Sequence, residues 1–306
     1  MEKNNLHVPV LLHETIELLN VKKGGIYVDC TTGRGGHSCE IYKKIGKEGK
    51  LICIDTDSEA IDYLTKKFAG KKNIIVVKGN FNQLESILKK NNIDKVDGIL
   101  ADLGVSSPMF DNEDRGFSYH NNGKIDMRMD LEQKNSAADI INNYSFAEMF
   151  KVFKTYGEIK NPRNVINVII KRRKEHPILE IKELVEIIKN NTKWDEKKKE
   201  KHPAKTYFQA LRIETNNELD NLKNLLSQGV KLLKKDGVMA IISFHSLEDK
   251  IVKDFFSSLI IDKTPKELPI VKKSDFVLTN KKPILGDEEE NKRARSAKLR
   301  GVKKNV

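Results

Sequence analysis

The first hundred residues alternate short apolar runs with amphipathic stretches, and this alternation constrains the fold more than any other feature of the chain. The apolar runs cover 26–30, 51–54, 74–77 and 98–101, and the amphipathic stretches between them cover 38–45, 60–68 and 81–88. Such an order is typical of βαβ units, in which helices join parallel strands and pack on the sheet. We therefore expect an α/β fold built on a doubly wound sheet.

The alternation stops after Asp102. Residues 104–123 are rich in Gly, Ser, Asp and Asn and follow neither a strand period nor a helix period. A loop this long inside a compact domain is usually functional. From 137 onward the apolar spacing is helical, and no strand candidate interrupts it.

The α/β pattern resumes near residue 217. It gives a helix over 219–233, a stop at 235–237, a strand over 238–244, a helix over 247–259, and then a turn-rich, basic remainder. We therefore expect the sheet domain to begin with 1–110 and to be completed by 217–306, which carries a basic C-terminal tail. Between these parts we expect a helical insertion over 111–216.

The basic residues are unevenly distributed. The chain has 56 Lys and Arg against 44 Asp and Glu, a formal net charge of +12. Residues 1–110 carry 16 basic and 14 acidic side chains, whereas 151–205 carry 16 against 8 and 281–306 carry 9 against 4. This asymmetry predicts that a nearly neutral part of the chain carries out catalysis and that a basic part binds a polyanion. A merely solvated lysine-rich surface is the alternative.

Several classes of protein are excluded by composition. No apolar stretch approaches the roughly 18 residues that a membrane helix needs, and residues 1–12 lack the apolar core of a secretory signal, so we expect a cytoplasmic protein with no membrane partner. The cysteines Cys30, Cys39 and Cys53 form no C-x-x-C pair, and no histidine pair has metal-ligand spacing. We expect neither disulfides nor a metal.

A glycine-rich loop lies between the first predicted strand and the first predicted helix. Its sequence is DCTTGRGGH over 29–37. A dinucleotide fingerprint would need a third glycine where Ser38 stands, and no triphosphate-binding G-x-x-x-x-G-K-[ST] is present. What remains is Asp29 four residues before a G-x-G-G turn, and Asp55 at the end of the second strand, where a carboxylate can accept both ribose hydroxyls.

This arrangement suits S-adenosylmethionine, a nucleoside with a methionine tail and no phosphate. The N–H groups of the following helix would then meet a carboxylate. Phe81, just beyond the third strand, could pack on the adenine ring. The alternatives are an ordinary strand-to-helix turn, helix capping by Asp55 and Asp57, and a core position for Phe81.

A second loop, DLGVSSP over 102–108, follows the fourth strand at the sheet edge where α/β proteins place their ligands. Methyl transfer to an exocyclic amine needs acceptors that polarise the amino hydrogens and hold the nitrogen in line. Asp102, Ser106 and Ser107, with a carbonyl fixed by Pro108, are the candidates; a plain turn is the alternative. His245, after the fifth strand, is interpreted as a hydrogen-bonded loop histidine.

Basic and aromatic residues alternate in the predicted insertion and its end. Segment 202–214 mixes His, Lys and Arg with Tyr and Phe, and 171–174 is a compact Lys-Arg-Arg-Lys cluster. RNA-binding surfaces use this combination for base stacking and phosphate pairing. Amphipathic helices have the same composition, so both interpretations stay open.

Taken together, the motifs resemble one family, the bacterial 16S ribosomal RNA (cytosine-N4) methyltransferases, also called the MraW or RsmH family. The matches are HVPVLLHE at 7–14, TTGRGGHS at 31–38, DLGVSSP at 102–108, RGFS at 115–118, DMRMD at 126–130, HPA at 202–204, FQALRI at 208–213, SFHSLED at 243–249 and RSAKLR at 295–300. They run in order along nearly the whole chain.

The resemblance implies a class I, Rossmann-like S-adenosylmethionine-dependent methyltransferase sheet with an inserted helical domain. It also implies the residues that contact the cofactor: Gly35, Gly36, His37, Asp55, Phe81 and Asp102. The chain departs from the family at Met109, where relatives usually carry glutamine, because a thioether cannot replace the hydrogen bonds of an amide. Cys30 and Thr32 replace a glycine and a phenylalanine that relatives often have.

We therefore expect an enzyme that methylates the exocyclic N4 of a cytidine in 16S ribosomal RNA, in the decoding region of the small ribosomal subunit. The sequence leaves the oligomeric state open. Two other classes are compatible with the same residues. One is a methyltransferase acting on a protein or a small molecule, and the other is a non-catalytic RNA-binding assembly factor.

Overall fold

The computed structural model describes residues 9–194, 202–261, 274–287 and 292–306 of the chain, so the first two residues of the motif at 7–14 lie outside the described residues. The chain forms two compact units. One comprises the chain up to Gly104 together with Leu219–Val306, and the other is Val105–Glu218. Val105 and Met109 pack into the apolar core of the second unit. Each unit is described by itself below.

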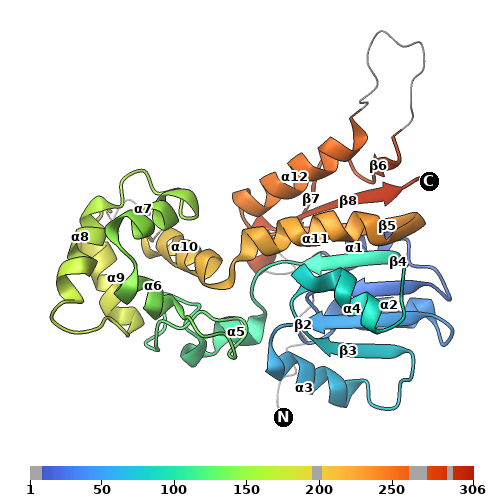
Figure 1. Ribbon diagram of the computed structural model, residues 1–306, viewed down its shortest axis with the longest axis horizontal. Coiled ribbons are helices and arrows are strands. Elements are labelled where there is room, and N and C mark those ends of the chain that lie inside the picture. Colours follow the sequence, from blue (N-terminus) through green and yellow to red (C-terminus); the bar gives the residue numbers. More distant parts are fainter. Residues whose placement is uncertain (1–8, 195–201, 262–273, 288–291) are drawn as a thin grey trace, which may run out of the picture. The chain divides into compact units, whose positions relative to one another are not determined.

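The first unit is built on one mixed sheet in the order β3-β2-β1-β4-β5-β8-β6, with β7 paired to β8 (Figure 1). The strands are β1 (Ile26–Asp29), β2 (Lys50–Asp55), β3 (Ile74–Lys78), β4 (Val96–Asp102), β5 (Leu233–Ser243), β6 (Phe276–Leu278), β7 (Ile284–Leu285) and β8 (Lys298–Lys304). The pairs among β1 to β5 are parallel. These strands read as nearly continuous apolar runs because both faces of the sheet are covered.

Each face of the sheet has its own apolar core. On one face lie α1 (Leu12–Leu18), α2 (Gly36–Ile45) and α3 (Ser58–Lys67). On the other lie η1 (Phe81–Gln83), α4 (Leu84–Lys90), α11 (Glu218–Leu232) and α12 (Ser246–Ile260). Asp57 caps α3, its side chain accepting a hydrogen bond from the Glu59 N–H at 3.3 Å. The α/β sheet expected from the sequence is confirmed.

The C-terminal part contains a strand that the sequence did not predict, and one expectation about it was wrong. The turn-rich, basic remainder also includes β8, which pairs antiparallel with β5 over six residue pairs, after η4 (Lys292–Ser296). In β8 the buried Leu299 and Val302 stand among four basic residues, which hide the strand pattern. The expected stop at 235–237 is a bulge in β5, where the register with β4 shifts between the Val96 and Gly98 pairs.

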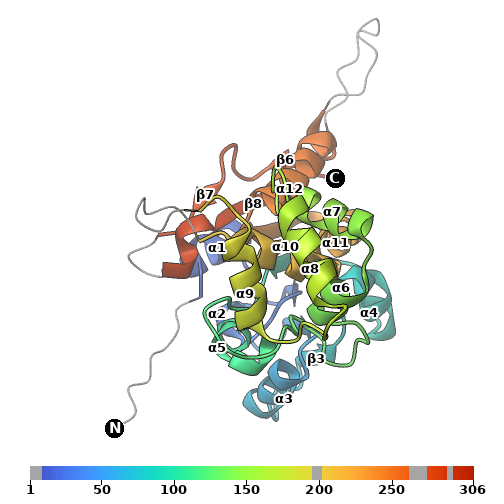
Figure 2. The ribbon, with the colours of Figure 1, turned by 90° about the vertical axis from the view of Figure 1, so that its left-hand side faces the viewer.

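The second unit is helical, as expected for the insertion (Figure 2, green to yellow). Its elements are α5 (Ser107–Asp111), η2 (Glu113–Arg115), α6 (Ala137–Asn143), α7 (Phe146–Thr155), α8 (Arg163–Arg172), α9 (Ile181–Asn190) and α10 (Ala204–Asn216). Capping boxes begin α6 at Ser136 and α7 at Ser145. The helices pack their apolar faces around one core.

The motif at 126–130 organises the loop that precedes α6. Arg128 makes a two-pronged ion pair with Asp126, at 2.9 and 2.7 Å, and donates to the carbonyls of Leu131 and Gln133. Arg115, which is buried, donates to the carbonyls of Arg128 and Met129. These contacts give both motifs a structural role within the insertion.

Among the residues that the structure describes, no helix combines the length and the apolar character needed to cross a bilayer.

Candidate active site

Three carboxylates stand at the carboxyl ends of neighbouring strands. Asp29, Asp55 and Asp102 are the last residues of β1, β2 and β4, and the sheet order places β1 between β2 and β4. The direction in which the chain winds reverses between β1 and β4. α/β sheets bind their ligands outside the strand ends at such a switch point, so the topology brings these acids to the expected place.

Asp55 holds the glycine turn. Its Oδ2 accepts a hydrogen bond from the Gly33 N–H at 2.8 Å, and its Oδ1 accepts one from the Asp57 N–H at 3.0 Å. Burial raises the pKa of the Asp55 carboxyl, and the two backbone N–H groups oppose that rise. The Asp55 carboxylate, a hydrogen-bond acceptor, is therefore held in a fixed position at the end of β2.

The glycines of this turn are required by backbone shape and by space. Gly35 precedes α2 with φ of 77°, in the left-handed region that side chains rarely adopt. A Cβ on Gly36 would lie 2.2 Å from Cγ of Pro9. The turn therefore excludes larger residues at both positions, and α2 begins with its N–H groups at the carboxyl edge of the sheet.

Ser38 has a role that glycine could not fill. Its hydroxyl donates to Oδ2 of Asp29 at 2.6 Å, and the Thr31 N–H donates to the other oxygen at 3.3 Å. Asp29 is 1% exposed, and burial raises its pKa to about 6. The serine that interrupts the dinucleotide fingerprint thus orients a buried acid.

Asp102 and His37 face each other without forming an ion pair. The His37 ring is buried, and its Nε2 lies 3.1 Å from the Val10 carbonyl, so Nε2 carries the proton. Burial lowers the His37 pKa to about 4, which keeps the ring neutral. Its Nδ1 is 3.8 Å from Oδ2 of Asp102, too far for a hydrogen bond.

Asp102 has unused acceptor capacity. Its backbone N–H donates to the Thr31 hydroxyl at 2.6 Å, which fixes the end of β4. Its Oδ1 is buried and has no hydrogen-bond partner within the described part of the chain. Burial, with the charges of Asp29 and Glu248 adding to it, raises the Asp102 pKa well above its ordinary value. A buried acceptor of this kind is costly unless a ligand satisfies it.

Phe81 follows β3 at the same edge. The Gly79 N–H donates to the Asp55 carbonyl at 2.9 Å, and the Asn80 side chain accepts from the Asn82 N–H at 2.9 Å, so η1 starts beside the end of β2. The Phe81 ring is partly buried and packs against the apolar core of its face. The ring is therefore fixed and still partly exposed.

The other two catalytic candidates belong to the second unit. Ser106 caps α5, its hydroxyl accepting from the Met109 N–H at 3.4 Å, and Ser107 is the first residue of that helix. Met109 is 5% exposed and packs in the insertion core. The structure therefore brings together Gly35, Gly36, His37, Asp55, Phe81 and Asp102, and describes Ser106 and Ser107 separately.

Sequence reasoning missed Glu248. Its Oε2 accepts from the Phe244 N–H at 2.8 Å, and its own N–H donates to Nδ1 of His245, the residue that caps α12. The interpretation of His245 as a hydrogen-bonded loop histidine is confirmed. The spacing is that of a capping box, but histidine replaces the usual serine or threonine, so the signal was weak.

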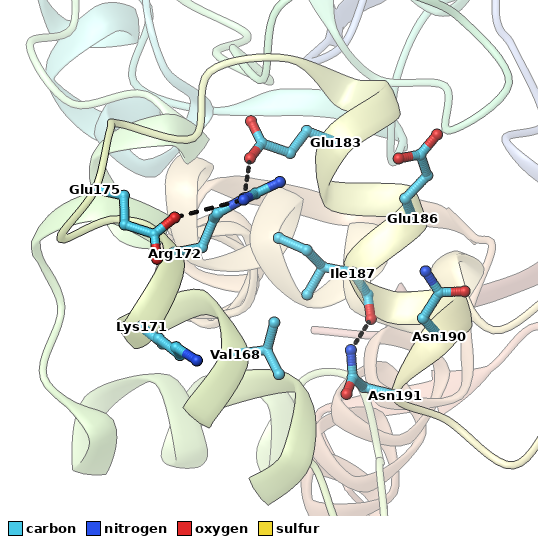
Figure 3. A pocket seen from close by; sticks show the side chains of 9 residues that line it. All are labelled: Val168, Lys171, Arg172, Glu175, Glu183, Glu186, Ile187, Asn190 and Asn191. Atoms are coloured by element: carbon cyan, nitrogen blue, oxygen red, sulfur yellow. Dashed lines mark hydrogen bonds and ion pairs between the residues drawn. The ribbon is translucent and has the colours of Figure 1, made fainter.

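The basic cluster at 171–174 lies at the end of α8, beside a groove of about 360 Å³ between α8 and α9 (Figure 3). Arg172 is 3.0 Å from Glu183 and 3.5 Å from Glu175, and Arg173 donates to the Ile141 carbonyl at 2.8 Å. Two of the four cations thus already have protein partners. Lys171 and Lys174 carry most of the charge that this cluster can offer a polyanion.

Comparison with known proteins agrees with these motifs. Proteins named "Ribosomal RNA small subunit methyltransferase H" are similar over nearly the full length: that of Ureaplasma urealyticum is 50% identical, covering 98% of this chain and 99% of its own. The relative from Clostridium botulinum strain 657 is 48% identical, covering 97% and 98%. The relative from Fusobacterium nucleatum is 45% identical, covering 98% of each.

Among solved structures, an rRNA methylase from Streptococcus thermophilus covers 100% of this chain and 99% of its own, with a TM-score of 0.40 and 10% identity. That similarity adds nothing to the assignment. The model of the MraW methylase family matches residues 4–305. With this match and the full-length relatives, the chain belongs to the MraW methylase family.

Proposed function

We propose that the chain transfers a methyl group from S-adenosylmethionine to the exocyclic N4 amine of a cytidine in 16S ribosomal RNA, in the decoding region of the small subunit. The observation that carries this proposal is the set of carboxylates Asp29, Asp55 and Asp102, all with raised pKa values, at the strand ends beside a glycine turn, in a chain of a methylase family. The relatives' name, which specifies small-subunit ribosomal RNA, supports the choice of substrate.

The residues present fit this cofactor. S-adenosylmethionine is cationic at sulfur and at its amino group, and buried carboxyls with raised pKa values gain from a cation beside them. The unsatisfied Oδ1 of Asp102 is such a group. Asp55 uses one lone pair on each oxygen for the turn, which leaves capacity for the two ribose hydroxyls.

The remaining contacts follow from position. Phe81 would pack on the adenine, and the N–H groups at Gly35, Gly36 and His37 would meet the methionine carboxylate at the N-terminus of α2. When bound, S-adenosylmethionine supplies an electrophilic methyl group. The neutral ring of His37 adds no positive charge to compete with the cofactor.

On the substrate side, the chain must hold an amine whose lone pair is delocalised into the base. The carboxyl of Asp102 would accept one of its N–H groups and orient the nitrogen. Ser106 and Ser107 stay candidates from the sequence motif for the same role. As the new N–C bond forms and the S–C bond breaks, N4 must lose one proton. A carboxylate with a raised pKa is a suitable acceptor for it, and we assign this role to Oδ1 of Asp102.

The insertion, for which the sequence suggests 111–216, would dock the RNA. Residues 151–205 hold 16 basic against 8 acidic side chains, which favours phosphate contacts. The target base must leave its stack to reach the carboxyl of Asp102. A cytoplasmic location, where ribosomes assemble, follows from this substrate.

The test follows the methyl group. Purified protein is incubated with isotopically labelled S-adenosylmethionine and small ribosomal subunits from a strain lacking the gene, and the RNA nucleosides are analysed by mass spectrometry. We expect labelled N4-methylcytidine. Label in protein or in a small molecule would support the first rival class, and no affinity for the cofactor would support a non-catalytic assembly factor.

A further inference from the structure

A cluster of aromatic rings on the insertion lies outside the site described above. His202, just before α10, stacks on Tyr119 with ring centroids 4.9 Å apart and planes 11° apart. Trp194, after α9, lies 5.0 Å from His202, and His120 lies 4.3 Å from Tyr119. We call Tyr119, His120, Trp194 and His202 the ring ladder.

One ring of the ladder, Tyr119, packs on the insertion core, and another, His120, is exposed. Tyr119 meets the buried ring of Phe208 edge-on at 5.9 Å, which ties the ladder to the insertion core. His120 is exposed, and the other three rings are partly exposed. The rest of the aromatic pattern on α10 is structural, because Tyr207 is also buried.

A cation belongs to the same cluster. The Lys189 ammonium, near the end of α9, lies 5.2 Å from the centre of the Trp194 ring. Lys193 and Lys205 are exposed and adjoin the ladder in sequence. Rings with a cation beside them can bind a nucleotide at two points, the base by stacking and the phosphate by charge.

The rings of the ladder differ from the side chains of an ordinary apolar core because each has a polar edge. The insertion core is made mainly of Ile, Leu, Val and Phe, whereas every ladder ring carries a nitrogen or a hydroxyl that can reach water or a base edge. Three separate chain segments bring them together. Unpaired RNA offers flat bases and phosphates to such a surface, whereas duplex RNA hides its bases.

We propose that the ring ladder binds unpaired bases of the RNA substrate, with Lys189 contacting a neighbouring phosphate. This inference rests on the proposed function, since it concerns the same RNA. In this proposal the ladder binds single-stranded nucleotides by stacking. The basic surface around it attracts phosphates without regard to base pairing.

Trp194 is the single tryptophan of the chain, so intrinsic fluorescence reports directly on the ladder. The full-length protein is titrated with a protein-free 16S fragment that carries an unpaired loop, and then with the same strand closed into a duplex. We expect the unpaired RNA to quench the emission and to bind about tenfold more tightly than the duplex. Equal affinity without quenching would overturn the proposal.

Variants separate stacking from charge. His120→Ala and Lys189→Ala should each weaken binding of the unpaired RNA by about five- to tenfold. His120→Phe, which keeps a flat ring, should restore most of the affinity lost in His120→Ala. Both positions are exposed, and thermal unfolding confirms that each variant is folded.

The insertion also supplies a matched control. Phe146 and Phe150 are stacked at 6.2 Å with Arg163 lying 5.5 Å from the Phe150 ring. This is a similar combination of rings and cation outside the ladder. Phe150→Leu and Arg163→Ala should leave the affinity within about twofold. If these control variants lose as much affinity for the unpaired RNA as the ladder variants do, any aromatic ring beside a cation would bind it. That result would contradict the proposal.

Two further outcomes are informative. If the ladder variants reduce methylation of intact small subunits but bind protein-free RNA normally, the ladder contacts a ribosomal protein and the proposal is wrong. Methyl transfer by the wild-type protein is measured separately. Its absence, with quenching and variant effects intact, would overturn the proposed function while leaving RNA binding by the ladder supported.

Discussion

The carboxylate of Asp55 accepts a hydrogen bond from the backbone N–H of Gly33 at 2.8 Å, so the end of β2 holds the turn that follows β1. One side chain thus shapes the glycine loop and faces the proposed ribose position. Removing this side chain should lower both the stability of the protein and its affinity for the cofactor. An experiment has to separate these two effects.

We predict that Asp55→Ala lowers the affinity for S-adenosylmethionine by at least about tenfold, because both the acceptor and the support of the turn are lost. Asp55→Asn keeps one oxygen for the Gly33 N–H but loses the acceptor for the Asp57 N–H, so it should lose less thermal stability than Asp55→Ala and still bind the cofactor weakly. Calorimetry measures both affinities. Wild-type affinity in either variant would remove Asp55 from the ribose role.

The glycine turn can be tested with a matched pair. Gly35 and Gly24 both have φ of +77°, but a Cβ on Gly35 would lie 2.8 Å from Cδ2 of Leu64, whereas one on Gly24 would meet nothing within 4 Å. Both alanine variants should lose about 1–2 kcal/mol of stability from backbone strain. Only Gly35→Ala should also lose cofactor affinity. Equal affinities in the two variants would mean that the turn does not contact the ligand.

Asp29 predicts a pH-dependent stability. Its pKa rises from 3.8 to about 6 on folding, so its stabilising contribution is complete below about pH 4 and is lost as the pH rises through 6. Asp29→Asn does not titrate and avoids that loss. As the pH rises, its free energy of unfolding should therefore increase relative to wild type, by at most about 3 kcal/mol above pH 7. Urea unfolding of both proteins between pH 4 and 8 measures the difference. A constant difference would contradict the pKa shift.

Asp102 predicts a coupling between cofactor binding and protons. Its raised pKa means that the free protein retains a proton over a pH range in which an ordinary aspartate has already lost it, and a cationic ligand favours the charged carboxylate. Binding should therefore release protons, and affinity should increase with pH through this range. Calorimetry in buffers with different ionisation heats counts the protons. Asp102→Asn should release fewer and bind more weakly; unchanged proton release would exclude Asp102 as the source.

The basic cluster on α8 gives a salt-dependence prediction. Lys171 and Lys174, changed together to glutamate, should reduce the slope of log affinity against log salt by about 2 if both contact phosphates. Arg172→Gln should change the slope less, because Glu175 and Glu183 already pair with that side chain. Binding to ribosomal RNA is measured between about 50 and 200 mM salt. An unchanged slope in the lysine variant would show that this cluster is not the docking face.

The acids of the site could be predicted from sequence because each one ends an apolar run. A parallel sheet brings the carboxyl ends of its strands to one edge, so Asp55 and Asp102 needed only correct strand assignments. The bond between Ser38 and Asp29 could not be predicted, because a fingerprint treats position 38 as a glycine that is missing. Nor could the partners of Arg172, which come from α9 and the turn after α8.

Local patterning also failed where a strand is dominated by charge. In β8 the basic side chains outnumber the buried apolar ones, so neither periodicity nor propensity identified it. Its position follows from pairing with β5, which is a long-range interaction. The helices of the insertion, by contrast, follow directly from apolar spacing that repeats every three to four residues.

The place of β8 in the sheet has a consequence for truncated forms of the protein. Both β6 and β7 join the sheet through β8, and β5 has β8 as its outer neighbour. Deleting residues from Lys298 onward would remove β8, detach β6 and β7, and leave the long apolar strand β5 with unpaired backbone groups at the new edge. Such an edge recruits other chains, so the shortened protein should precipitate rather than persist as a smaller enzyme.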